Sequence, residues 1–237
     1  METNYAYQSS YLVADAPPED RASFIRKTYM HLGGAILAFI ALEWVFFQTG
    51  LAVKSLEWLV AKGISWLIVL GAFMVVSWIA QKMADSGASA GVQYLGLGLY
   101  VVAEALIFMP LLMIASLYAR DIIPMAAIIT LLLFGGIAFT AFTTRTDFSF
   151  LGPILKIGGF VALGVIALAL IFGFTLGLLF SSIMVIFAGG CILYTTSNII
   201  HRYNTNQHVA ASLSLFASVA LMFWYVIRIL IALRGND

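Results

Sequence analysis

Seven long apolar segments, separated by short polar stretches, dominate the hydrophobic pattern of the chain. Each segment approaches the 20 or so apolar residues that a helix needs to span a bilayer. The connections hold the charges and turn formers, as in KSLEWLVAKG, ADSGASAG, YARD, TTRTDFSFLGP, FGFTLG and HRYNTNQH. The pattern predicts spanning helices near residues 29–49, 64–83, 94–116, 122–143, 154–172, 177–200 and 209–232.

The break between the fifth and sixth segments is the least marked, because no charge occurs from Ile157 to Ile200. We place a turn at Gly173–Gly177, since glycine adopts a positive φ at little steric cost. The alternative is that these two glycines form a GxxxG helix-packing motif. Four glycine pairs inside the segments predict close helix contacts. They are Gly33-Gly34, Gly135-Gly136, Gly158-Gly159 and Gly189-Gly190.

Composition assigns the chain to the all-α integral membrane proteins. Of its 237 residues, 62% are hydrophobic and 10% are charged, and the mean hydropathy is +1.02. Soluble domains are about 45–50% apolar and about 25% charged. The apolar runs do not alternate with a period of two, which excludes a β-barrel. The lipid bilayer is therefore the first partner to expect.

Charge and cysteine content narrow the remaining classes. A net charge of +1 argues against nucleic acid as a partner. The single cysteine, Cys191, allows no intramolecular disulfide, and the three histidines lack metal-ligand spacing, so we expect neither a metal nor a cofactor. The chain also lacks an HExxH motif and paired intramembrane aspartates, so we do not expect an enzyme.

Seven spans put the two termini on opposite sides of the membrane. Seven basic residues fall on the N-terminal side and five on the other, which places the N-terminus in the cytoplasm. We divide the chain into a polar, partly disordered cytoplasmic tail, residues 1–27, and a membrane domain, residues 28–237.

Three charged residues lie within predicted spans, where a charge at the bilayer centre costs about 2.5–3.5 kcal/mol or more. Glu43 and Arg228 lie near the outer ends of the first and last helices, so they can snorkel to water or form an ion pair. Glu104 lies at mid-depth, with Tyr100 and Gln93 on the same helical face. Its carboxyl group should be protonated, hydrogen-bonded or in a water-filled cavity. It is either a proton- or cation-sensitive site or a neutral interhelical hydrogen-bonding group.

The last predicted helix has a stripe of residues spaced 4, 3, 4 and 3 apart, which should face the bundle interior. The stripe consists of Ser214, Ser218, Leu221, Tyr225 and Arg228. Tyr194, Ser197 and His201 share a face at the end of the sixth helix, and the short loop between the two helices should bring both faces together.

The stretch FTAFTTRTDFSFLGP, residues 139–153, resembles the signature of the Bax inhibitor-1 family of transmembrane proteins. FIRKTYMHLGG resembles the opening of the family, and YTTSNIIHRYNTNQHVAASLSLF resembles its bacterial YccA-like branch. Within the signature loop we single out Arg145, Asp147 and Gly152, and we expect a loop ion pair or helix cap there.

The resemblance implies a seven-helix bundle in the bacterial inner membrane with the last helix enclosed by the others. It also implies one of two activities: modulation of the membrane protease FtsH, or a pH-sensitive leak of calcium or other cations. In the leak proteins two carboxylates share a proton, and the corresponding positions here are Thr195 and Ser218. A coupled acid pair is therefore absent at these positions. Glu104, at a similar depth, is the candidate for a single carboxylate facing them.

The sequence thus leaves two functions open. A regulator acting through membrane protein partners is favoured, because the acids of the leak switch are missing. A cation or proton leak, with calcium or protons as ligands, is the alternative. Under either function the candidate intramembrane polar site is Glu104, Thr195, Ser218 and Tyr100.

Overall fold

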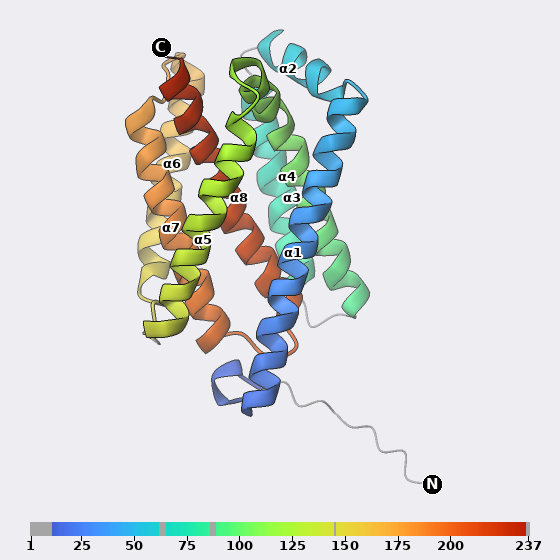
Figure 1. The fold of residues 1–237 in the computed structure, drawn as a ribbon, viewed down its shortest axis with the longest axis vertical. Coiled ribbons are helices and arrows are strands. Elements are labelled where there is room, and N and C mark those ends of the chain that lie inside the picture. The colour runs from blue at the N-terminus through green and yellow to red at the C-terminus, as the bar shows by residue number, and fades with distance from the viewer. Residues whose placement is uncertain (1–10, 62–64, 86–88, 145, 236–237) are drawn as a thin grey trace.

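The computed structural model describes residues 11–61, 65–85, 89–144 and 146–235. Seven helices in this part of the chain are long and apolar enough to cross a membrane, which confirms the predicted number of spans. Figure 1 shows them as an upright bundle. They are α1 (Pro18–Gln48), α3 (Ser65–Asp85), α4 (Ala90–Tyr118), α5 (Ile122–Thr144), α6 (Leu151–Phe172), α7 (Leu178–His201) and α8 (His208–Arg234).

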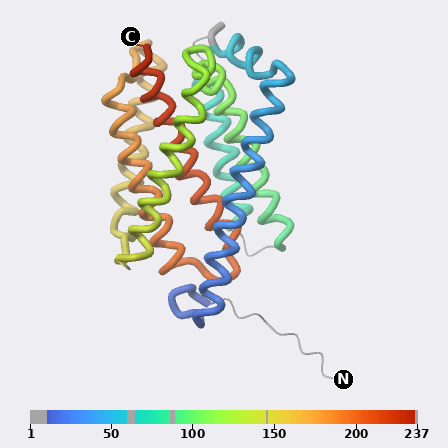
Figure 2. Tube along the Cα trace, viewed as in Figure 1, coloured from blue at the N-terminus to red at the C-terminus, as the bar shows by residue number. Residues whose placement is uncertain are grey.

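The last helix connects the two halves of the bundle. Figures 1 and 2 show α8 crossing obliquely between α5, α6 and α7 on one side and α1, α3 and α4 on the other. It contacts α1, α3, α4, α5 and α7. The start of α1 and the end of α8 lie at opposite ends of the bundle, and the starts of α4, α6 and α8 lie with that of α1 at the N-terminal end.

Aromatic side chains fill the space between α8 and the helices α1 and α4. Phe39 of α1 meets Phe108 of α4 edge-on, with ring centroids 5.2 Å apart, and meets Phe216 of α8 at 6.2 Å. Phe108 also contacts Trp224 of α8 at 5.0 Å. Edge-to-face pairs of this kind add to the stability that burial of the rings provides.

Two segments predicted to be loop or tail are helical. The connection after α1 contains α2 (Leu51–Ala61), which is too short to span a membrane and crosses the end of the bundle in Figure 1. It buries Ala52 and Leu59 and exposes Trp58, as an interfacial helix does. In addition, α1 begins at Pro18 rather than near residue 29, because Pro at the first position and Glu19 and Asp20 in the first turn favour a helix start.

The predicted turn between α6 and α7 is confirmed: α6 ends at Phe172, and the residue that caps it, Gly173, has a φ of 71°. The predicted close packing holds at only two of the four glycine pairs. A Cβ on Gly158 would lie 2.9 Å from the Phe187 ring, and one on Gly190 would lie 3.2 Å from Leu155. The other two pairs, Gly33-Gly34 and Gly135-Gly136, have open space at the Cβ position.

The closest contact at a glycine is at Gly96, which is not part of a glycine pair in the sequence. A Cβ on Gly96 of α4 would lie 2.6 Å from the Ala80 carbonyl oxygen and 2.8 Å from the Ala84 amide nitrogen of α3. Both are backbone atoms, so no side-chain rotation relieves the overlap. Gly96 therefore allows the α3 and α4 backbones to approach each other.

We predict that Gly96→Ala lowers the free energy of unfolding by about 1–3 kcal/mol, the usual effect of overpacking. Gly98→Ala is the matched control, since the Cβ position at Gly98 on the same helix is open. Thermal unfolding in detergent should show a lower midpoint for Gly96→Ala only. Equal midpoints for the two variants would contradict the assigned α3–α4 contact.

Candidate functional site

A buried pair of hydroxyl groups joins α7 to α8. The Thr195 and Ser218 oxygens lie 3.4 Å apart, and both residues are buried. The Ser218 hydroxyl donates to the Ser214 carbonyl at 2.9 Å. Because a serine hydroxyl has a single proton, Thr195 is the donor to Ser218. The pair is thus fully hydrogen-bonded without any charge.

A polar cleft of about 420 Å³ opens below this pair at the N-terminal end of the bundle. Its lining includes Asp85 and Lys82 from α3, Asn198 near the end of α7, and Ser214 from α8. Ser214 therefore belongs both to the cleft and to the chain of hydrogen bonds that reaches Thr195. The cleft and the hydroxyl pair therefore share Ser214, while Thr195 and Ser218 themselves do not line the cleft.

The loop between α7 and α8 completes the cleft. The Tyr203 hydroxyl donates to the Ser214 hydroxyl at 3.0 Å, and the Gln207 side chain donates to Asp85 at 3.0 Å. Burial raises the pKa of Tyr203, so its hydroxyl stays protonated and able to donate. The backbone amide of Val13 in turn donates to the Tyr203 carbonyl at 2.9 Å, which attaches the N-terminal segment to the same loop.

The signature loop docks on the end of α7. The Phe148 amide donates to the Ser197 hydroxyl at 2.9 Å, and Asp147 lies 3.9 Å from the Arg202 guanidinium. A Cβ on Gly152 would lie 3.1 Å from the Tyr194 ring, so a larger residue would require this ring to shift. The ion pair of Asp147 is thus with Arg202. Arg145, the other loop residue singled out from the sequence, lies outside the described residues.

These contacts correct the expected partner of one helix face. Among the described contacts, Tyr194 lies against Gly152 of α6, Ser197 accepts from the Phe148 amide of the signature loop, and His201 bonds to the Ser197 carbonyl. Thr195 and Asn198, on a different face of α7, are the residues directed toward α8 and the cleft.

The stripe on α8 does face the interior, as predicted, and follows α7 over its length. Besides the Ser214 and Ser218 contacts, Tyr225 packs against Phe180 of α7, with ring centroids 6.0 Å apart. Arg228 donates to the Leu176 carbonyl in the α6–α7 turn at 3.1 Å. The stripe therefore contacts α7 or the turn before it, from near the cleft to the opposite end of the bundle.

The ion pair between Glu43 and Arg228, one of the two arrangements left open by the sequence, is not formed between the described side chains. Arg228 is turned toward the α6–α7 turn because it shares the α7-facing stripe of α8. Glu43 is buried on α1, and neither of its carboxyl oxygens has a hydrogen-bond partner within the described residues. Glu43 and Arg228 lie near the same end of the bundle, but Arg228 extends from the side of α8 that faces the α6–α7 turn and not toward Glu43 on α1.

Glu104 occupies a different interface from Thr195 and Ser218. It is buried in α4, and its carboxyl group hydrogen-bonds with the Tyr100 hydroxyl one turn earlier. The Tyr100 ring contacts Phe73 of α3 and Phe216 of α8, each at 6.2 Å. Phe216 and Ser218 are two residues apart, which is about 200° around a helix. The structure therefore does not support the proposed meeting of Glu104 with the hydroxyl pair, because α8 lies between them.

A family model described as inhibitor of apoptosis-promoting Bax1 matches residues 21–235. The chain belongs to the Bax inhibitor-1 family. LIFEGUARD 4 of Arabidopsis thaliana is 32% identical over 90% of this chain and 85% of its own. No solved structure matches significantly.

Two bacterial relatives match over about half of each chain. An uncharacterized protein of Pseudomonas aeruginosa is 36% identical over 49% of this chain and 53% of its own. The modulator of FtsH protease YccA of Escherichia coli is 38% identical over 46% of this chain and 50% of its own. The match to the YccA protein confirms the resemblance to that branch of the Bax inhibitor-1 family.

One serine motif in this Bax inhibitor-1 family member lies outside the polar site. Residues 87–91 read GASAG, which matches the GxSxG pattern of serine hydrolases. That motif requires a strand-to-helix turn, whereas Ser89 stands between α3 and the start of α4. The described part of this connection does not provide the context of a nucleophile elbow.

The acid of the signature loop gives a pH-dependent prediction. The Ser149 amide donates to Asp147 at 2.9 Å and, with the Arg202 charge, holds the pKa of Asp147 below its usual value. A lowered folded-state pKa contributes stability above the unfolded-state pKa, and this contribution is lost as the pH falls through the folded-state pKa.

We therefore expect Asp147→Ala to lower the thermal midpoint at neutral pH. The difference from wild type should shrink once the pH falls below about 4. Asp147→Asn keeps an acceptor for Ser149 but does not titrate, so its thermal midpoint at neutral pH should lie between those of wild type and Asp147→Ala. A difference that persists unchanged in acid would contradict the assigned contacts.

Proposed function

We propose that the protein is a non-enzymatic regulator of the bacterial inner membrane that acts by binding membrane protein partners, with an FtsH-type membrane protease as the leading partner. The similarity to the Escherichia coli modulator of FtsH supports the partner class. The excess of basic residues at the N-terminal end supports a cytoplasmic N-terminus.

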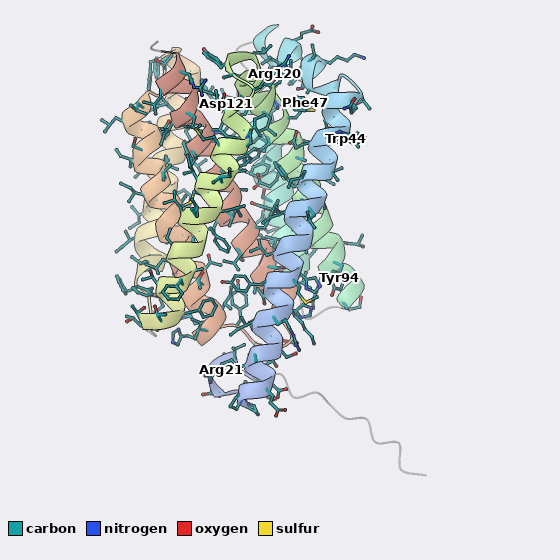
Figure 3. All side chains as sticks on the ribbon, in the orientation of Figure 1. Arg21, Trp44, Phe47, Tyr94, Arg120 and Asp121 are labelled. Carbon is teal, nitrogen blue, oxygen red and sulfur yellow. The ribbon has the colours of Figure 1, made fainter. Side chains whose placement is uncertain are left out.

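The observation that carries the proposal is the ordered polar surface at the N-terminal end of the bundle. Three segments that are distant in sequence meet there: residues 11–17, the signature loop and the α7–α8 loop. Arg21 donates to the Val13 carbonyl at 3.1 Å and also to the Ala14 carbonyl. Figure 3 shows Arg21 at this end, beside the start of α1. A composite surface built by backbone and side-chain hydrogen bonds is suited to binding a folded partner.

The test is crosslinking in bacterial membranes, followed by capture of the tagged full chain and quantification of the protease. We expect enrichment over an unrelated multispanning protein. A double variant, Arg21→Ala with Arg202→Ala, should reduce the recovered protease several-fold because it removes side-chain contacts from two of the three segments. Leu132→Ala, at a 71% exposed apolar position on α5, is the control and should behave as wild type. Equal recovery with the unrelated protein would reject the proposal.

A cation leak is the second candidate, and the position of the Thr195–Ser218 pair one turn above Ser214, which lines the cleft, favours it. A hydroxyl-lined route needs no carboxylate to accept a cation, although it offers weaker stabilisation than a charged site. This route runs between α7 and α8, away from Glu104.

Cation flux from liposomes tests this route. We predict that Thr195→Val with Ser218→Ala lowers the flux at least tenfold, while Glu104→Gln leaves it unchanged. Calcium, potassium and protons should be measured separately. No flux from the wild type, or the same flux from the hydroxyl variant, would reject the leak without affecting the protease proposal.

A further inference from the structure

A groove of about 730 Å³ runs between α1 and α4 on the outside of the bundle. Its lining is almost entirely apolar, and small residues form much of it. From the α1 side come Gly34, Ala35 and Ala38, and from the α4 side come Leu97, Gly98 and Val101. The groove is distinct from the polar cleft, which lies between α3, α7 and α8.

Large side chains border the groove, and its small residues leave the space open. Met30 is 68% exposed, and Val45, Tyr94 and Val102 are each between 41% and 45% exposed. A Cβ on Gly34 would meet no atom within 4 Å. The lining runs along α1 from Met30 to Val45, about 22 Å at 1.5 Å per residue. This length exceeds one leaflet of a hydrocarbon core, about 15 Å.

The N-terminal end of the groove has a cluster of groups that can carry positive charge. His31 Nδ1 lies 2.6 Å from the Lys27 carbonyl oxygen, so Nδ1 is the donor, and Nε2 lies 2.9 Å from the Tyr94 hydroxyl. The His31 and His208 rings are 5.0 Å apart. Lys27 lies one helical turn before His31 on α1, so one cationic side chain and two imidazole rings gather at this end of the groove. Figure 3 shows Tyr94 beside α1 toward this end of the bundle.

We propose that the α1–α4 groove binds an anionic phospholipid, with one acyl chain along Gly34, Ala38 and Gly98 and the phosphate at Lys27, His31 and His208. Basic clusters between membrane helices are suited to lipid phosphates. The site goes beyond the proposed function and does not depend on it.

Charge complementarity favours an anionic phospholipid in the groove over a helix from a partner protein or from a second copy of this chain. Small residues suit close helix packing as well. A spanning helix, however, presents mainly apolar side chains and would leave the cluster at Lys27 and His208 unmatched. An anionic lipid matches the apolar groove and the basic mouth together.

The experiment is native mass spectrometry of the purified full chain after exposure to phosphatidylglycerol or phosphatidylcholine with identical acyl chains. The wild type should retain phosphatidylglycerol at least threefold better. Gly34→Leu should reduce retention of both lipids about tenfold, because its side chain occupies the path of the acyl chain. Lys27→Gln with His208→Gln should remove the preference and leave phosphatidylcholine retention unchanged.

Gly135→Leu is the matched control, because the Cβ position at Gly135 on α5 is also open. It should retain lipid as the wild type does. If Gly34→Leu does not fold, Ala38→Phe blocks the same groove at a second point. Equal retention of the two lipids by the wild type, or undiminished retention by the groove-filling variant, overturns the proposal. A dimer that only the groove-filling variant dissociates would instead show that a helix occupies the groove.

Discussion

The seam between α7 and α8 determines how the rest of the bundle is arranged. In hydrocarbon there is no water to satisfy a polar group, so each unpaired group costs several kcal/mol. The polar side chains of α8 find their partners along one side, from Ser214 with Tyr203, through Ser218 with Thr195, to Arg228 with the Leu176 carbonyl. These contacts fix the rotation of α8 about its axis. An alternative rotation would present a guanidinium and several hydroxyls to apolar neighbours.

Once the rotation of α8 is fixed, its opposite side must pack against α1 and α4. That side presents Phe216 to Phe39 and Tyr100. Glu104 then lies beyond this aromatic layer, bonded to Tyr100 within its own helix. The same constraint therefore produces two separate polar regions. One opens through the cleft at the N-terminal end, and the other is enclosed within α4 and its neighbours.

The hydropathy pattern predicted where the helices begin and end. It did not predict contacts that depend on how each helix is rotated about its axis. The seven spans and the turn at Gly173 follow from the lengths and breaks of apolar runs. The ion pair between Glu43 and Arg228, one of two alternatives, does not form because equal depth does not determine which side of α8 carries the arginine. Gly96 was missed for the same reason, since only the facing α3 backbone distinguishes it from the open glycines. A short amphipathic helix in a connection, as in α2, is also missed by a search for long apolar segments.

The neutral pair at Thr195 and Ser218 bears on the choice between the two proposed functions. Two carboxylates held close would share a proton, and their interaction would change sharply with pH. The two hydroxyls form a hydrogen bond that has no titration over the physiological range. The contact across α7 and α8 therefore provides no proton-driven force to separate these helices. The N-terminal end instead has loops and a segment bonded to Tyr203 that are joined by hydrogen bonds between segments distant in sequence. This arrangement supports a regulator that responds to binding rather than a channel that responds to protons.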